Sequence, residues 1–491
     1  MKALLEPIKE IARFDELFRD LKKGTAGVTV ISGCLESQKA HMIAGLSEDA
    51  PVRLLIAENE LKAKELYEDY RLYDAETLYY PAKDLIFYQA DIHGNLLIRQ
   101  RLQVIQALLE RKEVTIITSV GGCMDFLLPL GVFEKHCIHL RNDSELDLDK
   151  IRKELVRLGY ESTFQVESTG QFSVRGGILD IYPLTEQNPI RIELWGDEID
   201  SIRSFDAESQ RSIENLEEIT IYPASELILT EDTIARGVKA IKKEAKAQST
   251  KFRDKMMTEE AARIRHAAEE ICDQIGEGEI LQGAEQYLHY FYPETVSFLD
   301  YLPDNSHIFL DEPNRIIECA DALEAEFQES VSHRLEKGYL LPGQAKLMCS
   351  TAELVAKLNR RGCVAVSLME PQKGEWNIRD EFSVTVKSVN SYNNQFPLLV
   401  KDLKSWKKAG YRIVLASPSR TRAQHLAEDL QNEEIPAFYS ENEERVLKPG
   451  EVMLIHGAAR RGFEYPMQKF VLITETDIFG KEKKKNRKKS E

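Results

Sequence analysis

The stretch QFSVRGGILDIYPLTEQNPIRIELW, residues 171–195, says most about how this chain folds. We interpret it as two strands joined by a short polar loop. Successive side chains of a strand point to opposite faces, so apolar residues at every second position should face a core. The residues with this spacing are Phe172, Val174, Ile190, Ile192 and Leu194. The glycine pair at 176 and 177 is typical of a bulge, so we follow the alternation of the first strand only as far as Arg175.

The other face of the two strands carries polar and aromatic side chains. It presents Arg191, Glu193 and Trp195 on the second strand, beside Ser173 and Arg175 on the first. Arginine and tryptophan dominate the energetic centres of protein interfaces, because each buries a large area and still offers directional donors. Two interpretations stay open at this point: a contact surface for another protein, and a solvated sheet face with one half-covered tryptophan, since single exposed apolar residues are common.

The segment FSVRGGILDIYP, followed by PIRIELWGDEIDSIRSFD, resembles the second domain of the transcription-repair coupling factor family, Mfd. It is similar, more distantly, to the same domain of the excision-repair protein UvrB. In both families this domain binds UvrA. The resemblance implies UvrA contacts at Arg175, Arg191 and Trp195, and we place Glu193 in the same surface. The family often has phenylalanine where this chain has Trp195, which is a conservative departure.

Length and composition set the frame for the rest of the chain. The 491 residues are too many for one core and predict about three domains. A hydrophobic content of 43% with 30% charged residues is typical of a soluble protein, and no apolar run is long enough for a bilayer. The amino terminus shows no signal or transit peptide, and the seven cysteines include no CxxC pair, so we expect reduced thiols and a cytoplasmic location. His136, Cys137 and His139 lack a fourth ligand, so we expect no metal.

The chain is strongly acidic, with a formal net charge of −17. A nucleic-acid duplex repels such a surface unless a basic patch is segregated from the rest. Only residues 481–489 are densely basic, and they read as a linker or a disordered end. Nucleic acid is therefore not the obvious partner of this chain taken alone.

Residues 27–47, GVTVISGCLESQKAHMIAGLS, predict a buried strand, a turn at Gly33 and a helix, which is the setting of a phosphate-binding P-loop. The pattern is altered, because Gln38 stands at the second glycine and Ala40 at the hydroxyl residue that would coordinate magnesium. Lys39 remains as an isolated charge. The helix amino terminus could still attract an anion. We expect no ATP hydrolysis here, and degenerate P-loops in the first domain are also a feature of the Mfd family, whereas UvrB keeps a working one.

The segment HIFLDEPNR, residues 307–315, resembles a Walker B strand. Asp311 and Glu312 stand at its magnesium and water-activating positions. Because the P-loop is altered, we interpret these carboxylates as relics, or as caps of a helix that begins near Asn314. Pro313 fits the first turn of such a helix.

Strands and helices alternate through much of the chain, which predicts a parallel sheet covered by helices. The predicted fold is α/β: a helicase-like parallel-sheet domain with a degenerate P-loop, interrupted by a small α+β UvrA-binding domain and followed by a second α/β lobe. The expected divisions are two halves of the first domain at 1–137 and 226–371, the inserted domain at 138–225, a linker at 372–394, a small α/β domain at 395–480 and a basic tail at 481–491.

Four further expectations bear on nucleic-acid binding. Residues 233–276 read as a helix pair packed on the surface, although a DNA-tracking helix is an alternative. The aromatic cluster Tyr79, Tyr80, Phe87 and Tyr88 is expected to pack in the protein rather than stack on bases, since no basic residues interleave with it. The connection from 84 to 96 is too short for the long hairpin of UvrB, which favours Mfd. Arg460 and Arg461 could contact a phosphate, but a loop salt bridge is the expected role.

The resemblance extends from residue 1 to 480 and implies the amino-terminal part of a coupling factor. Such a chain is a protein-binding module that recruits UvrA to lesions where RNA polymerase has stalled, with no catalytic residue and no cofactor of its own. In that family ATP, magnesium, RNA polymerase and duplex DNA are engaged by further domains, whose motifs this chain lacks, and no membrane is involved. The alternatives are a UvrB-like ATP-dependent damage-verification subunit and a purely structural spacer.

Overall fold

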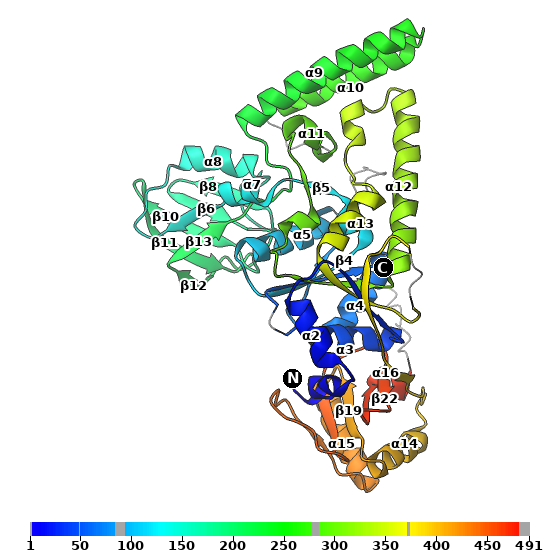
Figure 1. The fold of residues 1–491 in the computed structure, drawn as a ribbon. Helices are drawn as coiled ribbons and strands as arrows, with labels where there is room; N and C mark the ends of the chain where they lie inside the picture. Colours follow the sequence, from blue (N-terminus) through cyan, green and yellow to red (C-terminus); the bar gives the residue numbers. More distant parts are fainter. Residues whose placement is uncertain (1, 49, 84–93, 277–283, 371–373, 481–491) are drawn as a thin grey trace, which may run out of the picture.

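The computed structural model describes residues 2–480 except 49, 84–93, 277–283 and 371–373. Its largest element is a seven-stranded sheet in the order β17-β1-β16-β15-β2-β4-β3, in which every neighbouring pair is parallel (Figure 1). The strands are β1 (Gly27–Ser32), β2 (Val52–Ala57), β3 (Leu78–Tyr80), β4 (Val114–Ser119), β15 (His307–Asp311), β16 (Gly362–Val366) and β17 (Ile378–Ser383). The predicted parallel α/β sheet is therefore present.

Both faces of this sheet are buried, which explains the continuous apolar strands. On β2, Leu54 and Ile56 join one apolar core, while Leu55 and Ala57 join another on the opposite face. The main helices of this part are α2 (Phe14–Lys22), α3 (Glu36–Leu46), α4 (Glu60–Tyr70), α5 (Gly94–Leu109), α12 (Pro313–Glu336) and α13 (Thr351–Arg360). Pro313 is the first residue of α12, as predicted.

A second sheet of six strands interrupts the first domain, in the order β12-β11-β10-β9-β8-β7. The chain enters it beside β6 (Ile138–Arg141) and leaves it beside β13 (Glu218–Ile221), and these two strands pair antiparallel with each other. Its strands are β7 (Glu161–Ser162), β8 (Gln171–Arg175), β9 (Ile178–Ile181), β10 (Ile190–Trp195), β11 (Glu198–Phe205) and β12 (Ser212–Leu216). The helix α8 (Leu148–Arg157) begins at Asp147, whose side chain accepts from two backbone amides.

The prediction of two strands across residues 171–195 is wrong, because the structure has three. The two glycines form the tight turn of a hairpin between β8 and β9 rather than a bulge, and Arg175 lies opposite Ile178. Gly176 has a φ of +60°, a backbone conformation that residues with a side chain rarely adopt. Residues 196–197 form a second tight turn, with Trp195 opposite Glu198.

The predicted alternation holds for the core but not for every residue. Phe172, Ile190 and Ile192 are buried, whereas Val174 and Leu194 are only partly buried. On the opposite face, Ser173 is buried although the pattern predicted exposure. The physical reason is that its hydroxyl donates to the backbone of the loop before β8, which covers it.

Residues 231–276 form the predicted helix pair, α9 (Glu231–Asp254) and α10 (Thr258–Gly276). The two helices lie side by side, and Ser249 Oγ donates to the carbonyl of Ala261 at 3.0 Å. They project away from the sheets at one end of the molecule (Figure 1). Thr230 caps the start of α9.

A third sheet, in the order β18-β22-β23-β19-β21-β20, forms the small α/β lobe. Its elements are β18 (Lys387–Ser388), α14 (Phe396–Lys408), β19 (Arg412–Ser417), α15 (Arg420–Asn432), β20 (Ala437–Tyr439), β21 (Val452–His456), β22 (Phe463–Tyr465), β23 (Phe470–Thr474) and α16 (Glu475–Phe479). The expectation of a linker at 372–394 is wrong in part, because β17 is an edge strand of the large sheet and pairs with β1. The polar sequence of β17 did not indicate a strand, because an edge strand is exposed on one side and can carry polar side chains there.

Short elements complete the description. They are α1 (Lys2–Leu5), α6 (Val120–Met124), α7 (Leu130–Lys135), α11 (Leu288–Phe291), β5 (Phe126–Leu127) and β14 (Val296–Ser297), with 3₁₀ turns at Glu6–Glu10, Ala284–Tyr287, Phe298–Tyr301 and Pro342–Ala345. Within the described ranges, every helix is too short or too polar to cross a bilayer.

Candidate functional site

Two arginines of the inserted sheet share one buried carboxylate. Asp180, on β9, is 1% exposed and lies directly opposite Arg191 on β10. Arg191 donates from Nε to Oδ1 at 2.7 Å and from Nη2 to Oδ2 at 2.9 Å. Arg175, at the end of β8, donates from Nη2 to Oδ2 at 2.9 Å. Two positive groups over one negative group leave a net positive charge. We call Arg175, Asp180, Arg191 and Trp195 the arginine face.

Arg175 and Arg191 differ in the exposed fraction of the side chain and in the number of hydrogen bonds that each makes. The Arg191 side chain is 17% exposed, also donates to Gln210, and lies with its guanidinium 4.5 Å from the ring centre of Phe205. The hydrogen bonds that Arg191 donates to Asp180 hold the pKa of Arg191 above its ordinary value. The Arg175 side chain is 38% exposed and makes one hydrogen bond to Asp180. Arg175 therefore keeps more donors for a partner.

Trp195 is the most exposed member of this face. Its exposure is 84%, at the end of β10 where the hairpin turns. Glu193, two residues before it, forms an ion pair with Arg203 and accepts from Ser201. Glu193 is thus engaged within the domain, whereas the indole contacts solvent.

Sequence reasoning missed Asp180 and Phe164 in this surface. Phe164 is 83% exposed, and the guanidinium of Arg175 lies 5.8 Å from its ring centre. A signal for Asp180 was present, because an acid between two apolar strand residues needs a cross-strand partner when it is buried. Arg191 supplies that partner once β9 is recognised as a separate strand.

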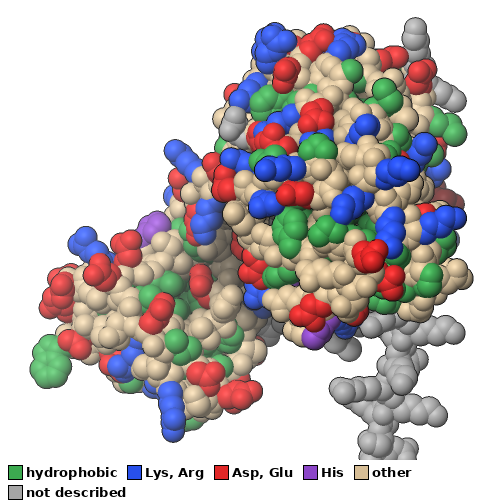
Figure 2. Space-filling view, turned by 90° about the horizontal axis from the view of Figure 1, so that it is seen from below, with side chains coloured by type: hydrophobic (Ala, Val, Ile, Leu, Met, Phe, Trp, Pro, Cys, Tyr) green, Lys and Arg blue, Asp and Glu red, His purple; other side chains and the backbone are tan. Residues whose placement is uncertain are grey.

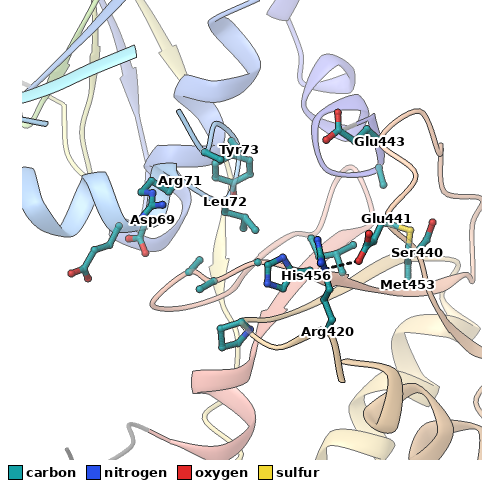
Figure 3. Close-up of a pocket in the computed structure, with 18 of the residues that line it drawn as sticks. Asp69, Arg71, Leu72, Tyr73, Arg420, Ser440, Glu441, Glu443, Met453 and His456 are labelled. Atoms are coloured by element: carbon teal, nitrogen blue, oxygen red, sulfur yellow. Dashed lines mark ion pairs between the residues drawn. The ribbon is translucent and has the colours of Figure 1, made fainter. Parts of the chain in front are cut away.

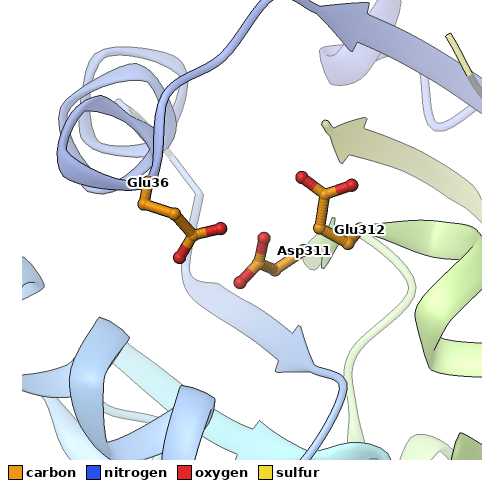
Figure 4. A group of neighbouring side chains, drawn as sticks. All are labelled: Glu36, Asp311 and Glu312. Atoms are coloured by element: carbon orange, nitrogen blue, oxygen red, sulfur yellow. The ribbon is translucent and has the colours of Figure 1, made fainter. Parts of the chain in front are cut away.

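The altered P-loop also contains a shared-charge cluster, with the signs reversed. Lys39, on α3, is 1% exposed. Its Nζ lies 2.7 Å from Glu36, 2.6 Å from Asp311 and 2.7 Å from Glu312. Figure 4 shows the three carboxylates converging from the start of α3 and the end of β15. They lie close enough together to hold a metal ion, but the ammonium of Lys39 lies among them.

The ionisation of this cluster follows from burial and mutual attraction. Burial raises the pKa of Asp311 to about 6, against the opposing effect of Lys39. Burial alone would lower the pKa of Lys39, but Asp311 and Glu36 outweigh it and raise that pKa. Burial opposes ionisation of Glu36 as well, yet Lys39 and Lys62 lower its pKa. A phosphate group brought to this lysine would meet carboxylates already in place.

Two backbone amides at the start of the turn are also occupied. The N–H of Gly33 donates to the carbonyl of Leu368 at 3.2 Å, and that of Cys34 to Ser367 at 3.0 Å. Gly33 has a φ of +80°, and a Cβ at this position would overlap the carbonyl oxygen of Val384. Two amides of this turn therefore donate to protein carbonyls, and together with the carboxylates around Lys39 they do not fit a nucleotide phosphate.

The substituted P-loop positions belong to packing between lobes. Ala40 is buried in the core. Gln38 donates from Nε2 to the hydroxyl of Tyr465, in the third sheet, at 2.5 Å. His41 places Nδ1 3.2 Å from the same hydroxyl and Nε2 2.7 Å from the carbonyl of Leu4. Burial lowers the pKa of His41 to about 4, so the ring is neutral at pH 7.

The same two lobes enclose a cavity of about 820 Å³. Figure 3 shows side chains of α4 on one side and of the third lobe on the other, among them Asp69, Arg420, Glu441 and His456. The side chain of Arg420 pairs with Glu441 at 2.8 Å. Charges of both signs line the cavity, and Arg460 there pairs with Asp69.

Arg460 and Arg461 both form ion pairs, as predicted. Arg460 pairs with Asp69 and Glu65 of α4, each at 2.8 Å. Arg461 lies 3.8 Å from Asp477. The Arg460 contacts bind the loop after β21 to the first domain, whereas the Arg461 contact lies within the small α/β lobe.

Other predicted residues are dispersed. Tyr79 and Tyr80 are buried, and Tyr80 stacks on Phe298 with ring centres 4.1 Å apart, which confirms their packing role. Phe87, Tyr88 and most of the connection from 84 to 96 lie outside the described residues. His136 and His139 contact separate groups, a backbone carbonyl and a threonine hydroxyl.

The sequence of this chain matches a known domain family and several known proteins. Residues 138–227 match the family model described as the UvrB interaction domain. The chain is 32% identical to the transcription-repair-coupling factor of Bacillus subtilis, over 96% of this chain and 41% of that protein. It is 30% identical to the corresponding protein of Staphylococcus aureus, over 100% of this chain and 41% of that protein. For Staphylococcus haemolyticus the identity is 28%, over 94% and 39%.

The fold and the matched segment define an α/β protein that carries a UvrB interaction domain within a parallel-sheet domain. The chain is a relative of the transcription-repair-coupling factors and corresponds to the amino-terminal region of Mfd. The resemblance found in the sequence is thereby confirmed. The chain spans about two fifths of the length of the curated relatives it matches.

Proposed function

We propose that this chain binds UvrA through the arginine face of its inserted domain. The observation that carries the proposal is the 84% exposure of Trp195 at the end of β10, the strand that also carries Arg191. A large aromatic side chain in water is a source of binding energy, because a partner that covers it removes apolar area from solvent. The match of residues 138–227 to the UvrB interaction domain supports this choice of surface.

The charges of the face indicate what UvrA would offer. Asp180 neutralises one guanidinium, so the pair of arginines retains one positive charge. Arg175, which is partly exposed, would receive a carboxylate of UvrA in a charge-assisted hydrogen bond, while Arg191 would stay tied to Asp180. Arg175 and Trp195 are therefore the direct contacts in this proposal, and Arg191 shapes the face. Glu193 contributes by holding Arg203 at its edge.

We infer that the chain acts as an adaptor rather than as a UvrB-like enzyme. Lys39 is surrounded by carboxylates, and the amides of Gly33 and Cys34 donate to protein carbonyls, which argues against a phosphate site for ATP at this position. In the proposed role the chain brings UvrA to lesions where RNA polymerase has stalled in the cytoplasm. Contacts with RNA polymerase and the ATP-driven motor would belong to other parts of a coupling factor.

The test is a titration of the chain against purified UvrA by isothermal calorimetry. Trp195→Ala should weaken binding by about 2–4 kcal/mol, and Arg175→Ala by a smaller amount. Met256→Ala is a matched control, because this side chain is 91% exposed at the α9–α10 turn, far from the inserted sheet.

Equal affinity of Trp195→Ala and the parent chain would place the UvrA surface elsewhere. Absence of binding by the parent would refute the proposal as a whole. Binding of a fluorescent ATP analogue by the parent, lost in Lys39→Met, would restore the enzymatic alternative.

A further inference from the structure

The helix α9 carries a segregated row of basic side chains in an otherwise acidic chain. Positions three, four and seven residues apart lie on one face of a helix. Exposed basic residues occupy such positions from residue 239 onward and again two turns later. They are Lys239, Lys242, Lys243, Lys246 and Arg253, and we call them the α9 stripe.

The α9 stripe points away from the protein. The buried positions of α9 include Ile241, Ala245 and Phe252, which pack against α10 and the core on the opposite side. All five side chains of the stripe are exposed. At 1.5 Å per residue the stripe is about 21 Å long. The helix pair projects from the body of the molecule, so a long partner could lie along it (Figure 1).

The charges of the α9 stripe are not neutralised by any described neighbour. Over the part of the chain that the structure describes, no member of the stripe lies within ion-pair distance of an acid. The neighbouring α10 does carry exposed acids, including Glu269, Glu270 and Asp273. By contrast, many lysines elsewhere pair with an acid three residues away, as in Lys9–Glu6, Lys23–Asp20 and Lys62–Glu65. Like charges four residues apart weaken a helix. The stripe contains two such pairs, 239 with 243 and 242 with 246.

The basic α9 stripe contrasts with the negative net charge of the whole chain. The chain has a formal charge of −17, and a random surface of such a protein would repel polyanions. On the face seen in Figure 2, basic and acidic side chains are intermingled over the larger lobe. The α9 stripe is instead of one sign along its length.

We propose that the α9 stripe binds the phosphate backbone of a nucleic-acid duplex. Its length spans about six phosphates of one strand at 3.4 Å per phosphate. Its composition favours phosphate over a protein partner. Lysine is depleted in protein interfaces, whose centres need aromatic or other apolar anchors, and the stripe contains none. Contacts of this kind are independent of sequence and position a protein on DNA without reading bases.

The test is the anisotropy of a fluorescein-labelled 30-base-pair duplex titrated with the full chain at 50 to 200 mM salt. The stripe variant carries Lys239→Glu, Lys243→Glu and Lys246→Glu. The matched control carries Lys401→Glu, Lys404→Glu and Lys408→Glu, three exposed lysines with similar helical spacing on α14. Both variants change the net charge equally, and circular dichroism checks their folding.

We expect the stripe variant to bind the duplex at least about tenfold more weakly than the parent at 50 mM salt. Its slope of log K against log salt should be less negative by about 2–3, because about 0.9 is lost for each phosphate contact. The α14 control should change binding by less than about threefold. The neutral triple variant with glutamine at the three α9 positions should lose most of the same affinity, which excludes a folding defect caused by the new acids.

Three results would overturn the proposal. The first is a parent chain that does not bind the duplex at 50 mM salt. The second is an equal loss in the stripe and α14 variants, which would mean a diffuse effect of net charge. The third is polyglutamate displacing the duplex as well as unlabelled duplex does, which would assign the stripe to an acidic polypeptide.

Discussion

The arginine face and the Lys39 cluster are built on the same plan with opposite signs. In one, Asp180 is shared by two arginines; in the other, Lys39 is shared by three carboxylates. The Lys39 cluster is enclosed at the junction of β1 and α3, and its lysine is 1% exposed. The arginine face lies open beside Trp195, and Arg175 there is only partly engaged. A shared charge therefore marks a binding surface only where donors remain free and accessible.

The difference also separates the two functional hypotheses for this chain. A nucleotide site needs free amides and an unpaired lysine, whereas here Lys39 is paired with carboxylates and the amides of Gly33 and Cys34 donate to protein carbonyls. A protein-binding site needs an exposed anchor with directional donors, and the inserted sheet presents both. Variants in each cluster can test whether one is structural and the other is functional.

The largest effect is expected from Lys39→Met. Removing the ammonium leaves Asp311 and Glu312 close together without their cation, and breaking a buried ion pair from one side costs about 3–5 kcal/mol. The free energy of unfolding, measured with urea and far-ultraviolet circular dichroism, should fall by that amount. Lys62→Met is the control, because Lys62 pairs with Glu36 at the surface and should cost less than about 1 kcal/mol. Equal effects of the two substitutions would contradict a structural role for the Lys39 cluster.

The two arginines of the inserted sheet should respond differently to truncation. Arg191→Ala leaves the buried Asp180 with a single partner and should destabilise the domain by about 1–3 kcal/mol. Arg175→Ala removes a more exposed group and should cost less than about 1 kcal/mol. Hydrogen exchange of amides in β9 and β10 measures this locally. Faster exchange in Arg175→Ala than in Arg191→Ala would reverse the assignment of structural and contacting roles.

The pH dependence of stability should reveal Asp311. Its pKa is raised to about 6 in the folded chain, above the ordinary value of 3.8, so the folded state binds the proton more tightly. The contribution of this carboxyl to stability is therefore present at low pH and declines as pH rises from about 4 to about 6. Compared with the parent, Asp311→Asn should become relatively more stable across that window, by about 1 kcal/mol per pH unit at the steepest point.

A surface acid provides the control for this measurement. Hydrogen bonds from Ser209 lower the pKa of Asp206, so its contribution is lost only as pH falls below the ordinary value. Asp206→Asn should therefore show no change relative to the parent between pH 4 and 6. A parallel slope in the two variants would mean that Asp311 does not titrate in this range.

The smallest effect is expected at the edge of the arginine face. Phe164→Ala should weaken UvrA binding by less than about 1 kcal/mol, because a rim residue contributes little beside a central anchor. Calorimetry with Trp195→Ala on the same day gives the comparison. A larger loss for Phe164 than for Trp195 would move the centre of the contact toward the loop before β8.

Residues 171–195 show what sequence reasoning could and could not reach. Period-two patterns identified the core positions Phe172, Ile190 and Ile192, because burial on one face depends on local alternation. The separate strand β9 was missed, since a glycine pair fits a bulge as well as a hairpin turn and only the pairing partner decides. Because β9 was not recognised, the sequence did not predict that Asp180 lies between Arg175 and Arg191.

The P-loop region shows the same limit. Substitution of the glycine and hydroxyl positions predicted a loss of phosphate binding from local chemistry alone. The closing contacts come from residues far away in the sequence: Asp311 lies 272 positions beyond Lys39, and Gln38 meets Tyr465 across 427 positions. The first contact follows from the strand order of the large sheet and the second from the packing of two lobes, and no local pattern encodes either.

The pairing of β6 with β13 has a consequence for how this architecture arose. The chain leaves the parent domain and returns to it on two adjacent antiparallel strands, so the inserted sheet hangs from a single two-stranded stem. A module attached in this way can be gained, lost or exchanged between proteins without altering the register of the seven-stranded sheet, because its two ends already lie together. The stem is thus a natural grafting point, and transplanting residues 138–221 onto another scaffold needs only two chain ends held one strand spacing apart.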